Sequence, residues 1–152
     1  MWIDENLAEV RGRIDRACAA AGRDPAEVRL LPVSKTKPPA AIREAYDAGV
    51  RLFGENKVQE AVAKAEVFAD VPDLKFAVIG HLQTNKAKQV AAVAAEFHAL
   101  DSLRVADALD RRLQLLGRTL DVFVQVNSSA EESKFGLPPE EVPAFARELE
   151  RF

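Results

Sequence analysis

The sequence predicts an α/β fold in which parallel strands alternate with helices. Five short apolar runs are each followed by a segment whose apolar residues recur at helical spacing. The centres of these runs lie near residues 31, 53, 78, 99 and 124, so successive runs are 22, 25, 21 and 25 residues apart. A connection of this length has room for a helix that carries the chain back to the starting edge of a sheet. The pattern therefore favours right-handed crossovers and a parallel sheet.

An amphipathic helix is expected before the first strand. Its apolar residues at helical spacing are Leu7, Val10, Ile14, Ala17 and Cys18. Asp4 or Asn6 has a side chain that can cap the helix start, and Gly22 can end the helix in a left-handed conformation.

The strand–helix units follow one another without a linker. In order, strand first, they are 28–35 with 40–48, 50–56 with 58–69, 74–80 with 84–95, 97–101 with 103–116, and 121–127 with 138–151. Pro38 and Pro39 precede the first of these helices, where proline is tolerated. Since no change of composition marks a boundary, we expect one domain over residues 1–152.

Composition excludes several classes of protein. Hydrophobic residues make up 48% and charged residues 30%, which is typical of a globular chain, and the net charge of -3 does not attract nucleic acid. Cys18 is the only cysteine, so an intrachain disulfide is excluded. No apolar run reaches the ~18 residues of a membrane span, and Asp4 and Glu5 stand where a signal peptide has basic residues. We expect a cytoplasmic protein with no membrane partner.

Polar side chains follow each predicted strand, at the edge where active groups of parallel α/β proteins gather. They include Lys35, Asn56 and His81. Such residues also occur at exposed strand ends and helix caps without any further role. Lys35 is harder to explain in that way. A lysine that ends an apolar strand is expected to be partly desolvated, which favours the uncharged amine that attacks an aldehyde.

Two architectures fit five strand–helix units. A five-stranded open, doubly wound sheet is complete at this length, whereas a (β/α)8 barrel takes about 250 residues and rarely fewer than about 200. Length alone favours the open sheet.

Four motifs, in this order, carry a resemblance to a known family. They are Val33-Ser34-Lys35-Thr36-Lys37-Pro38, Phe53-Gly54-Glu55-Asn56-Lys57-Val58-Gln59-Glu60, Ile79-Gly80-His81-Leu82-Gln83-Thr84-Asn85-Lys86, and Val126-Asn127 with Glu132-Ser133-Lys134-Phe135-Gly136. With these motifs the chain resembles the pyridoxal phosphate homeostasis proteins, which are similar to the N-terminal barrel domain of alanine racemase. The resemblance implies a partial (β/α)8 barrel, with about five units after an N-terminal helix, in place of the open sheet.

The resemblance also implies a cofactor and its site. Lys35 matches the lysine that forms an aldimine with pyridoxal 5′-phosphate, Asn56 matches the asparagine beside the cofactor ring, and His81 matches a histidine of the same pocket. Lys37 and Lys134 match two further family lysines, which are equally explained as solvated groups.

The function implied is binding of pyridoxal 5′-phosphate in intracellular vitamin B6 homeostasis, with apo-enzymes as acceptors and no turnover by the chain itself. Two alternatives stay open. One is a racemase-like pyridoxal-phosphate enzyme acting on amino acids, although the only tyrosine, Tyr46, lies in a predicted helix. The other is a defective half-barrel without cofactor function. No metal site is expected, because His81 and His98 lie apart without cysteine or carboxylate ligands at suitable spacing.

The family pattern extends beyond the last residue of this chain. At roughly 23 residues a unit, the last three units of an eight-unit barrel amount to about seventy residues. In the family the last two strands and their loops bind the cofactor phosphate. The resemblance therefore implies a truncated or frame-shifted product, or a pocket that another chain completes.

Overall fold

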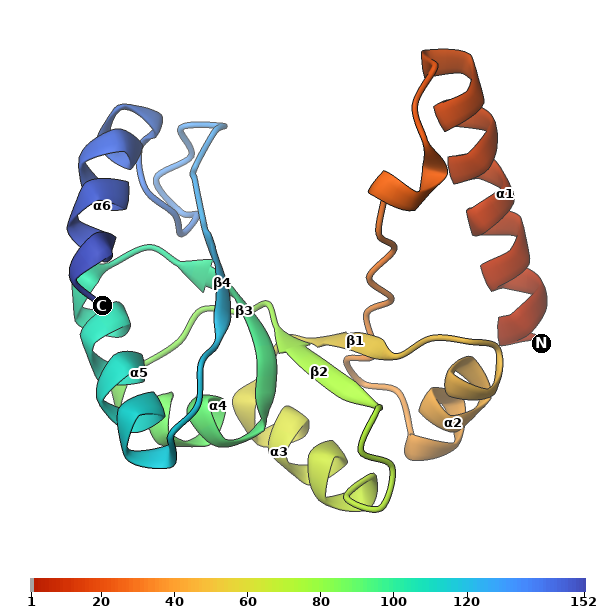
Figure 1. Ribbon diagram of the computed structural model, residues 1–152, viewed down its shortest axis with the longest axis horizontal. Helices are drawn as coiled ribbons and strands as arrows, with labels where there is room; N and C mark the ends of the chain where they lie inside the picture. Colours follow the sequence, from red (N-terminus) through yellow and green to blue (C-terminus); the bar gives the residue numbers. More distant parts are fainter. Residues whose placement is uncertain (1) are drawn as a thin grey trace.

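A computed structural model describes residues 2–152 of the chain. Within this range four parallel strands form one sheet: β1 (Leu52–Glu55), β2 (Lys75–Val78), β3 (Ala94–Leu100) and β4 (Asp121–Val124). The strands lie in the order β1-β2-β3-β4, each beside the one that precedes it in the chain (Figure 1). The prediction of an α/β fold with a parallel sheet is confirmed.

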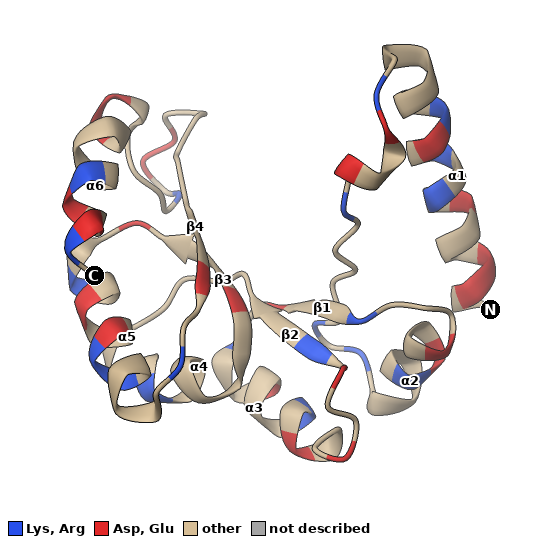
Figure 2. Ribbon diagram, viewed as in Figure 1, with Lys and Arg blue, Asp and Glu red and all other residues tan. Residues whose placement is uncertain are grey.

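The helices that follow the strands lie along the outer side of the curved sheet, whereas the N-terminal helix precedes the first strand and stands at one end of the sheet (Figure 1). The α-helices are α1 (Ile3–Ala21), α2 (Pro39–Asp47), α3 (Val58–Val67), α4 (Ala87–Val93), α5 (Leu103–Leu116) and α6 (Val142–Glu148). Short 3-10 turns are η1 (Pro25–Glu27), η2 (Thr84–Lys86), η3 (Pro139–Glu141) and η4 (Leu149–Arg151). Charged residues lie on the helices and also on the strands and connecting segments, and α1, α5 and α6 each carry both signs of charge (Figure 2).

The strand order decides between the two predicted architectures. A doubly wound sheet reverses its order at a switch point, whereas a barrel adds each strand beside the last. The sequential order observed here is that of a partial barrel, so the open doubly wound alternative is wrong. Length suggested the wrong answer because it limits how many strands are present and does not determine in which order they pair.

The first predicted strand, 28–35, keeps its place but is not a regular strand. It runs parallel to β1 through one bridge between Val33 and Gly54. Gly54 N donates to Pro32 O at 2.8 Å, and Ser34 N donates to Gly54 O at 2.9 Å. Pro32 has no N–H to donate, so a continuous ladder through this run is impossible.

Other predicted boundaries also shift. The helix expected over 84–95 ends at Val93, because Ala94 pairs with Phe76 as the first residue of β3. Helix α1 begins before Asp4, with Trp2 at its N-cap and no side-chain cap, so the cap prediction is wrong. Gly22 does end the helix, with φ of 65°.

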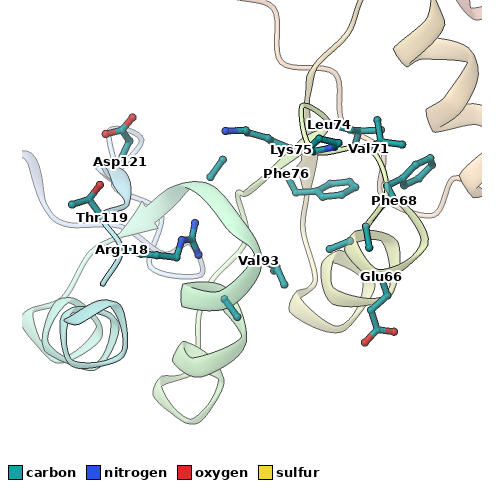
Figure 3. A pocket seen from close by; sticks show the side chains of 15 residues that line it. Glu66, Phe68, Val71, Leu74, Lys75, Phe76, Val93, Arg118, Thr119 and Asp121 are labelled. Carbon is teal, nitrogen blue, oxygen red and sulfur yellow. The ribbon is translucent and has the colours of Figure 1, made fainter. Parts of the chain in front are cut away.

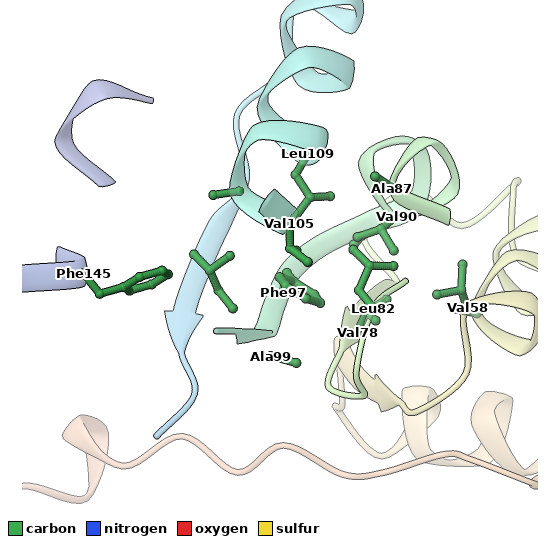
Figure 4. Packing of buried hydrophobic residues seen from close by; sticks show 14 residues of the cluster. Val58, Val78, Leu82, Ala87, Val90, Phe97, Ala99, Val105, Leu109 and Phe145 are labelled. Atoms are coloured by element: carbon green, nitrogen blue, oxygen red, sulfur yellow. The ribbon is translucent and has the colours of Figure 1, made fainter. Parts of the chain in front are cut away.

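The main hydrophobic core lies between the sheet and its helices. Phe97 of β3 is fully buried against Val105 and Leu109 of α5 and against Val90 of α4 (Figure 4). A second cluster joins Phe53 and other residues of β1 and β2 to α1 and α2. Because side chains alternate along a strand, burial of Phe53 on the helix side places Gly54 on the concave side.

A half-buried ion pair, in which Glu96 is buried and Arg29 is exposed, connects the first segment to β3 across two intervening strands. Arg29 Nη1 and Nη2 donate to the two carboxylate oxygens of Glu96 at 2.5 and 2.8 Å. His98 Nε2 lies 2.8 Å from Glu96 Oε1. The hydrogen bonds from Arg29 outweigh the effect of burial and lower the pKa of Glu96. The ion pair therefore connects the first segment, where the barrel begins, to β3.

Replacing Glu96 with Gln should lower the free energy of unfolding at pH 7 by about 1–2 kcal/mol, because a neutral amide cannot accept both guanidinium bonds. The Glu96 pKa is lower in the folded than in the unfolded chain, so its contribution is present above about pH 4 and is lost as pH falls through the folded pKa. Urea unfolding of wild type and Glu96→Gln from pH 7 to pH 3 measures this difference.

Asp107→Asn provides the matched control, since it removes the exposed Arg111–Asp107 pair of α5. This change should cost about 0–1 kcal/mol. A difference between wild type and Glu96→Gln that stays constant at all pH values would contradict the assignment.

Candidate functional site

The sheet brings the three predicted site residues to one edge. Lys35 follows the segment beside β1, Asn56 follows β1 directly, and His81 follows β2. These strands are parallel neighbours, so their carboxyl ends lie at the same edge, which we call the carboxyl edge. All three side chains are exposed there. The observed strand order thus brings Lys35, Asn56 and His81 to the same edge of the sheet, as the sequence predicts.

The segment that leads to Lys35 lines the concave side of the sheet. A Cβ placed on Gly54 would lie 3.3 Å from Val33 Cγ2 and 3.6 Å from Leu31 Cδ2, so Leu31 and Val33 cover Gly54 on that side. Lys35 follows this segment, at the start of a turn. The expectation of a desolvated amine is wrong, because Lys35 is exposed. Its segment pairs with β1 on one side, and no second strand covers the other side within residues 2–152.

The backbone beside Lys35 is hydrogen-bonded to a cluster of charged and polar side chains that was not predicted from the sequence. It consists of Ser34, Glu55 and Lys64, all buried, with Glu60 partly buried at its margin. Ser34 Oγ donates to Glu55 Oε1 at 2.6 Å. Lys64 Nζ donates to Ser34 O at 2.6 Å, to Glu55 Oε1 at 2.5 Å and to Glu60 Oε1 at 2.8 Å. All three ammonium protons of Lys64 are thereby used.

The charges of this cluster support each other. Burial alone would lower the pKa of Lys64, but the hydrogen bonds to Glu55 and Glu60 raise it above its usual value. The Lys64 ammonium in turn lowers the pKa of Glu60, together with the backbone N–H of Thr36. Lys64 and Glu60 therefore stabilise each other's charged form beside the Lys35 segment.

The sequence contains a pattern from which this cluster could have been predicted. Lys64 stands three residues after Ala61, which is fully buried, and six after Val58, so it lies on the apolar face of the predicted helix. A lysine on that face requires a buried partner. The i, i+4 spacing of Glu60 and Lys64 points to one of the partners.

Asn56 is in close contact with the end of β2. A Cβ on Gly80 would lie 2.1 Å from Asn56 O and 2.9 Å from Asn56 Oδ1, so no side chain fits at position 80. The glycine allows the chain that leads to His81 to approach Asn56. Asn56 and the His81 segment are thus brought together at the carboxyl edge.

His81 stacks on a distant segment. Its ring lies 3.8 Å from the ring of Phe135, with an interplanar angle of 8°. Gly136 N donates to Asp101 Oδ2 at 3.1 Å, which attaches the same loop to the end of β3. The loop that contains Lys134 is therefore folded back over the carboxyl edge, where Lys134, like Lys37, is exposed.

A large cavity lies elsewhere. A cavity of about 660 Å³ at the amino ends of β2 and β4 is lined by Lys75, Phe76, Arg118 and Asp121, among others (Figure 3). Arg118 donates to the backbone oxygens of Ala91 and Ala94 there, so its guanidinium already has partners. The cavity does not contain any of the predicted site residues.

Among residues 2–152, no three His, Cys, Asp or Glu side chains are grouped so that they could hold a metal ion. No helix in this range is long and apolar enough to cross a membrane.

Comparison with known proteins places this arrangement in a family. The sequence profile of the alanine racemase N-terminal domain matches residues 6–152. The pyridoxal phosphate homeostasis protein of Pseudomonas aeruginosa is 47% identical over 149 residues, which cover 98% of this chain and 64% of that protein. The protein of the same name from Escherichia coli K12 is 44% identical over 146 residues, or 95% of this chain and 62% of that protein.

Solved structures agree. The structure of PipY from Synechococcus elongatus PCC7942 with PLP bound has a TM-score of 0.76 and 40% identity, over 90% of this chain and 63% of PipY. Alanine racemase from Streptomyces coelicolor, at 15% identity and a TM-score of 0.63 over 95% of this chain and 39% of the racemase, shares the fold. This chain spans less than two thirds of the length of these relatives. The predicted resemblance to the pyridoxal phosphate homeostasis proteins is confirmed, and the chain belongs to the family with the alanine racemase N-terminal domain.

Proposed function

We propose that this chain binds pyridoxal 5′-phosphate at the carboxyl edge, covalently on Lys35, and takes part in vitamin B6 homeostasis without a reaction of its own. The observation that carries the proposal is the strand order, which puts Lys35, Asn56 and His81 at one edge. The structure of PipY with PLP bound, 40% identical to this chain, supports the choice of cofactor.

Lys35 has the chemistry that the aldehyde of the cofactor requires. As an uncharged amine, Lys35 would hold the cofactor through the cofactor's aldehyde, a group that condenses with primary amines and releases water. The exposed position of Lys35 leaves the amine open to a molecule from solvent. No oxidant or metal is needed for this step.

Asn56 and His81 would orient the bound molecule. The Asn56 amide can both donate and accept hydrogen bonds, and its contact with Gly80 restricts its position. The stacked rings of His81 and Phe135 offer a flat surface on the same edge. An aromatic pyridine ring is a suitable partner for such a surface.

A binding role is favoured over racemisation by the environment of Tyr46. A two-base racemase needs a second acid or base opposite the lysine. Tyr46 Oη donates instead to Asp73 Oδ1 at 2.7 Å, and the Arg51 guanidinium lies 4.0 Å from the centre of its ring. Asp73 precedes β2, so Tyr46 lies toward the amino ends of the strands, away from Lys35. Transfer of the bound cofactor to apo-enzymes fits such a binding role.

Borohydride reduction of the chain incubated with pyridoxal 5′-phosphate should place the pyridoxyl group on Lys35. The reduction converts the carbon–nitrogen double bond to a stable amine that peptide mass mapping locates. Lys35→Met should abolish this adduct, whereas the matched control Lys37→Met should retain it. An adduct confined to Lys37 or Lys134 would refute the assignment, and a wild-type chain with no adduct would favour a half-barrel without cofactor function.

Asn56→Ala should weaken cofactor binding roughly 2- to 12-fold, because one hydrogen bond without a buried charge contributes about 0.5–1.5 kcal/mol. Titration of the imine absorbance in wild type and variant measures this change. The control is Asn85→Ala, an exposed asparagine of η2. Equal affinity of Asn56→Ala and wild type would remove Asn56 from the site.

A further inference from the structure

We propose that Glu60 and Lys64 of α3 are positioning residues, which hold the backbone on both sides of Lys35 and so set the direction in which its amine leaves the chain. The inference rests on the proposed function of Lys35. It assigns to a pair of helix residues a role in cofactor binding that requires no contact with the cofactor.

The two peptide groups that flank the Cα of Lys35 both bind this pair. The carbonyl of Ser34 belongs to the peptide group before Lys35, and it accepts a hydrogen bond from Lys64 Nζ at 2.6 Å. The N–H of Thr36 belongs to the peptide group after Lys35, and it donates to Glu60 Oε1 at 2.5 Å. Lys64 Nζ and Glu60 Oε1 are themselves joined at 2.8 Å. One ion pair thus fixes the chain on either side of Lys35.

The backbone at this turn needs such support. Thr36 has φ of 63°, in the left-handed region that is unfavourable for a β-branched residue. The turn is closed by Lys37 N, which donates to Ser34 O at 3.0 Å. Without a partner for the Thr36 N–H, the turn could relax to an ordinary φ. The direction of the Lys35 side chain would then change with it.

Packing of α3 on the sheet does not explain the contact made by Glu60. Lys64 already joins α3 to β1 through the fully buried Glu55. Glu60 lies nearer the surface, with 25% of its side chain exposed, and its carboxylate oxygen Oε1 binds Lys64 and Thr36. Its loss therefore affects the turn at Lys35 more than the core. Glu60 is the better residue to change, since Lys64→Met would leave Glu55 buried without its cation.

Lys37 supplies an internal reference. It lies two residues after Lys35 in the same turn, is exposed, and carries the same reactive group. A general loss of folding or of cofactor concentration alters adduct formation at both lysines. A change in the direction of Lys35 alters the ratio of the two adducts.

The experiment compares wild type, Glu60→Ala, Glu60→Gln and the matched control Glu66→Ala. Glu66 is an exposed carboxylate on the same helix, so its removal makes the same change of charge. Each chain is incubated with pyridoxal 5′-phosphate and reduced with borohydride. Mass mapping then gives the ratio of adduct at Lys35 to adduct at Lys37, and a thermal melt of each variant reports folding.

Glu60→Ala should lower the Lys35:Lys37 ratio roughly 3- to 10-fold, which corresponds to about 0.7–1.4 kcal/mol, the contribution of one ordinary hydrogen bond. Glu60→Gln keeps an oxygen that can accept from Thr36 N–H and should restore most of the ratio, and Glu66→Ala should match wild type. A ratio in Glu60→Ala equal to wild type would overturn the positioning role, whether or not its melting temperature falls. A wild type without any Lys35 adduct would instead overturn the proposed function itself.

Discussion

The hydrogen bonding of residues 32–34 to Gly54 is the constraint on which the site depends. These two backbone hydrogen bonds form the single bridge at Val33. Within residues 2–152 they are the only ladder contacts between the first segment and β1. They place Lys35 beside Asn56 in the parallel order of strand ends. The buried Ser34–Glu55–Lys64 cluster reinforces this weak ladder from the helix side, since Ser34 and Lys64 both bind Glu55. Side-chain bonds thus strengthen a ladder that lacks the one backbone bond Pro32 cannot donate.

The two faces of the sheet stabilise the structure through different interactions. On the helix side, Phe97 and its neighbours bury apolar surface and stabilise the strand order. On the concave side, Arg29 and Glu96 form a charged connection between non-adjacent strands. The carboxyl edge lies between these faces and contains exposed polar side chains. The backbone on either side of Lys35 is fixed there by hydrogen bonds to Lys64 and Glu60. A rigid backbone that carries accessible side chains suits the binding of a small molecule from solvent.

Most of the strand positions follow from sequence pattern, because apolar runs alternate with helical spacing at a regular interval. Details that depend on contacts between distant parts of the chain could not be predicted from this pattern. Ala94 joins a strand because Phe76 is beside it, although alanine favours a helix. Lys35, Asn56 and His81 were identified as strand-end residues and through family motifs, and the strand order explains why they share an edge. The roles of Glu60 and Lys64 were missed, since they arise from contacts between α3 and a turn more than twenty residues earlier.

A crystal structure of this chain grown with pyridoxal 5′-phosphate would test the central claim most directly. Our account predicts electron density continuous with Lys35 Nζ at the carboxyl edge, with the ring beside Asn56 and His81. Density for the cofactor in the cavity at the opposite edge, near Lys75 and Arg118, with Lys35 unmodified, would contradict it.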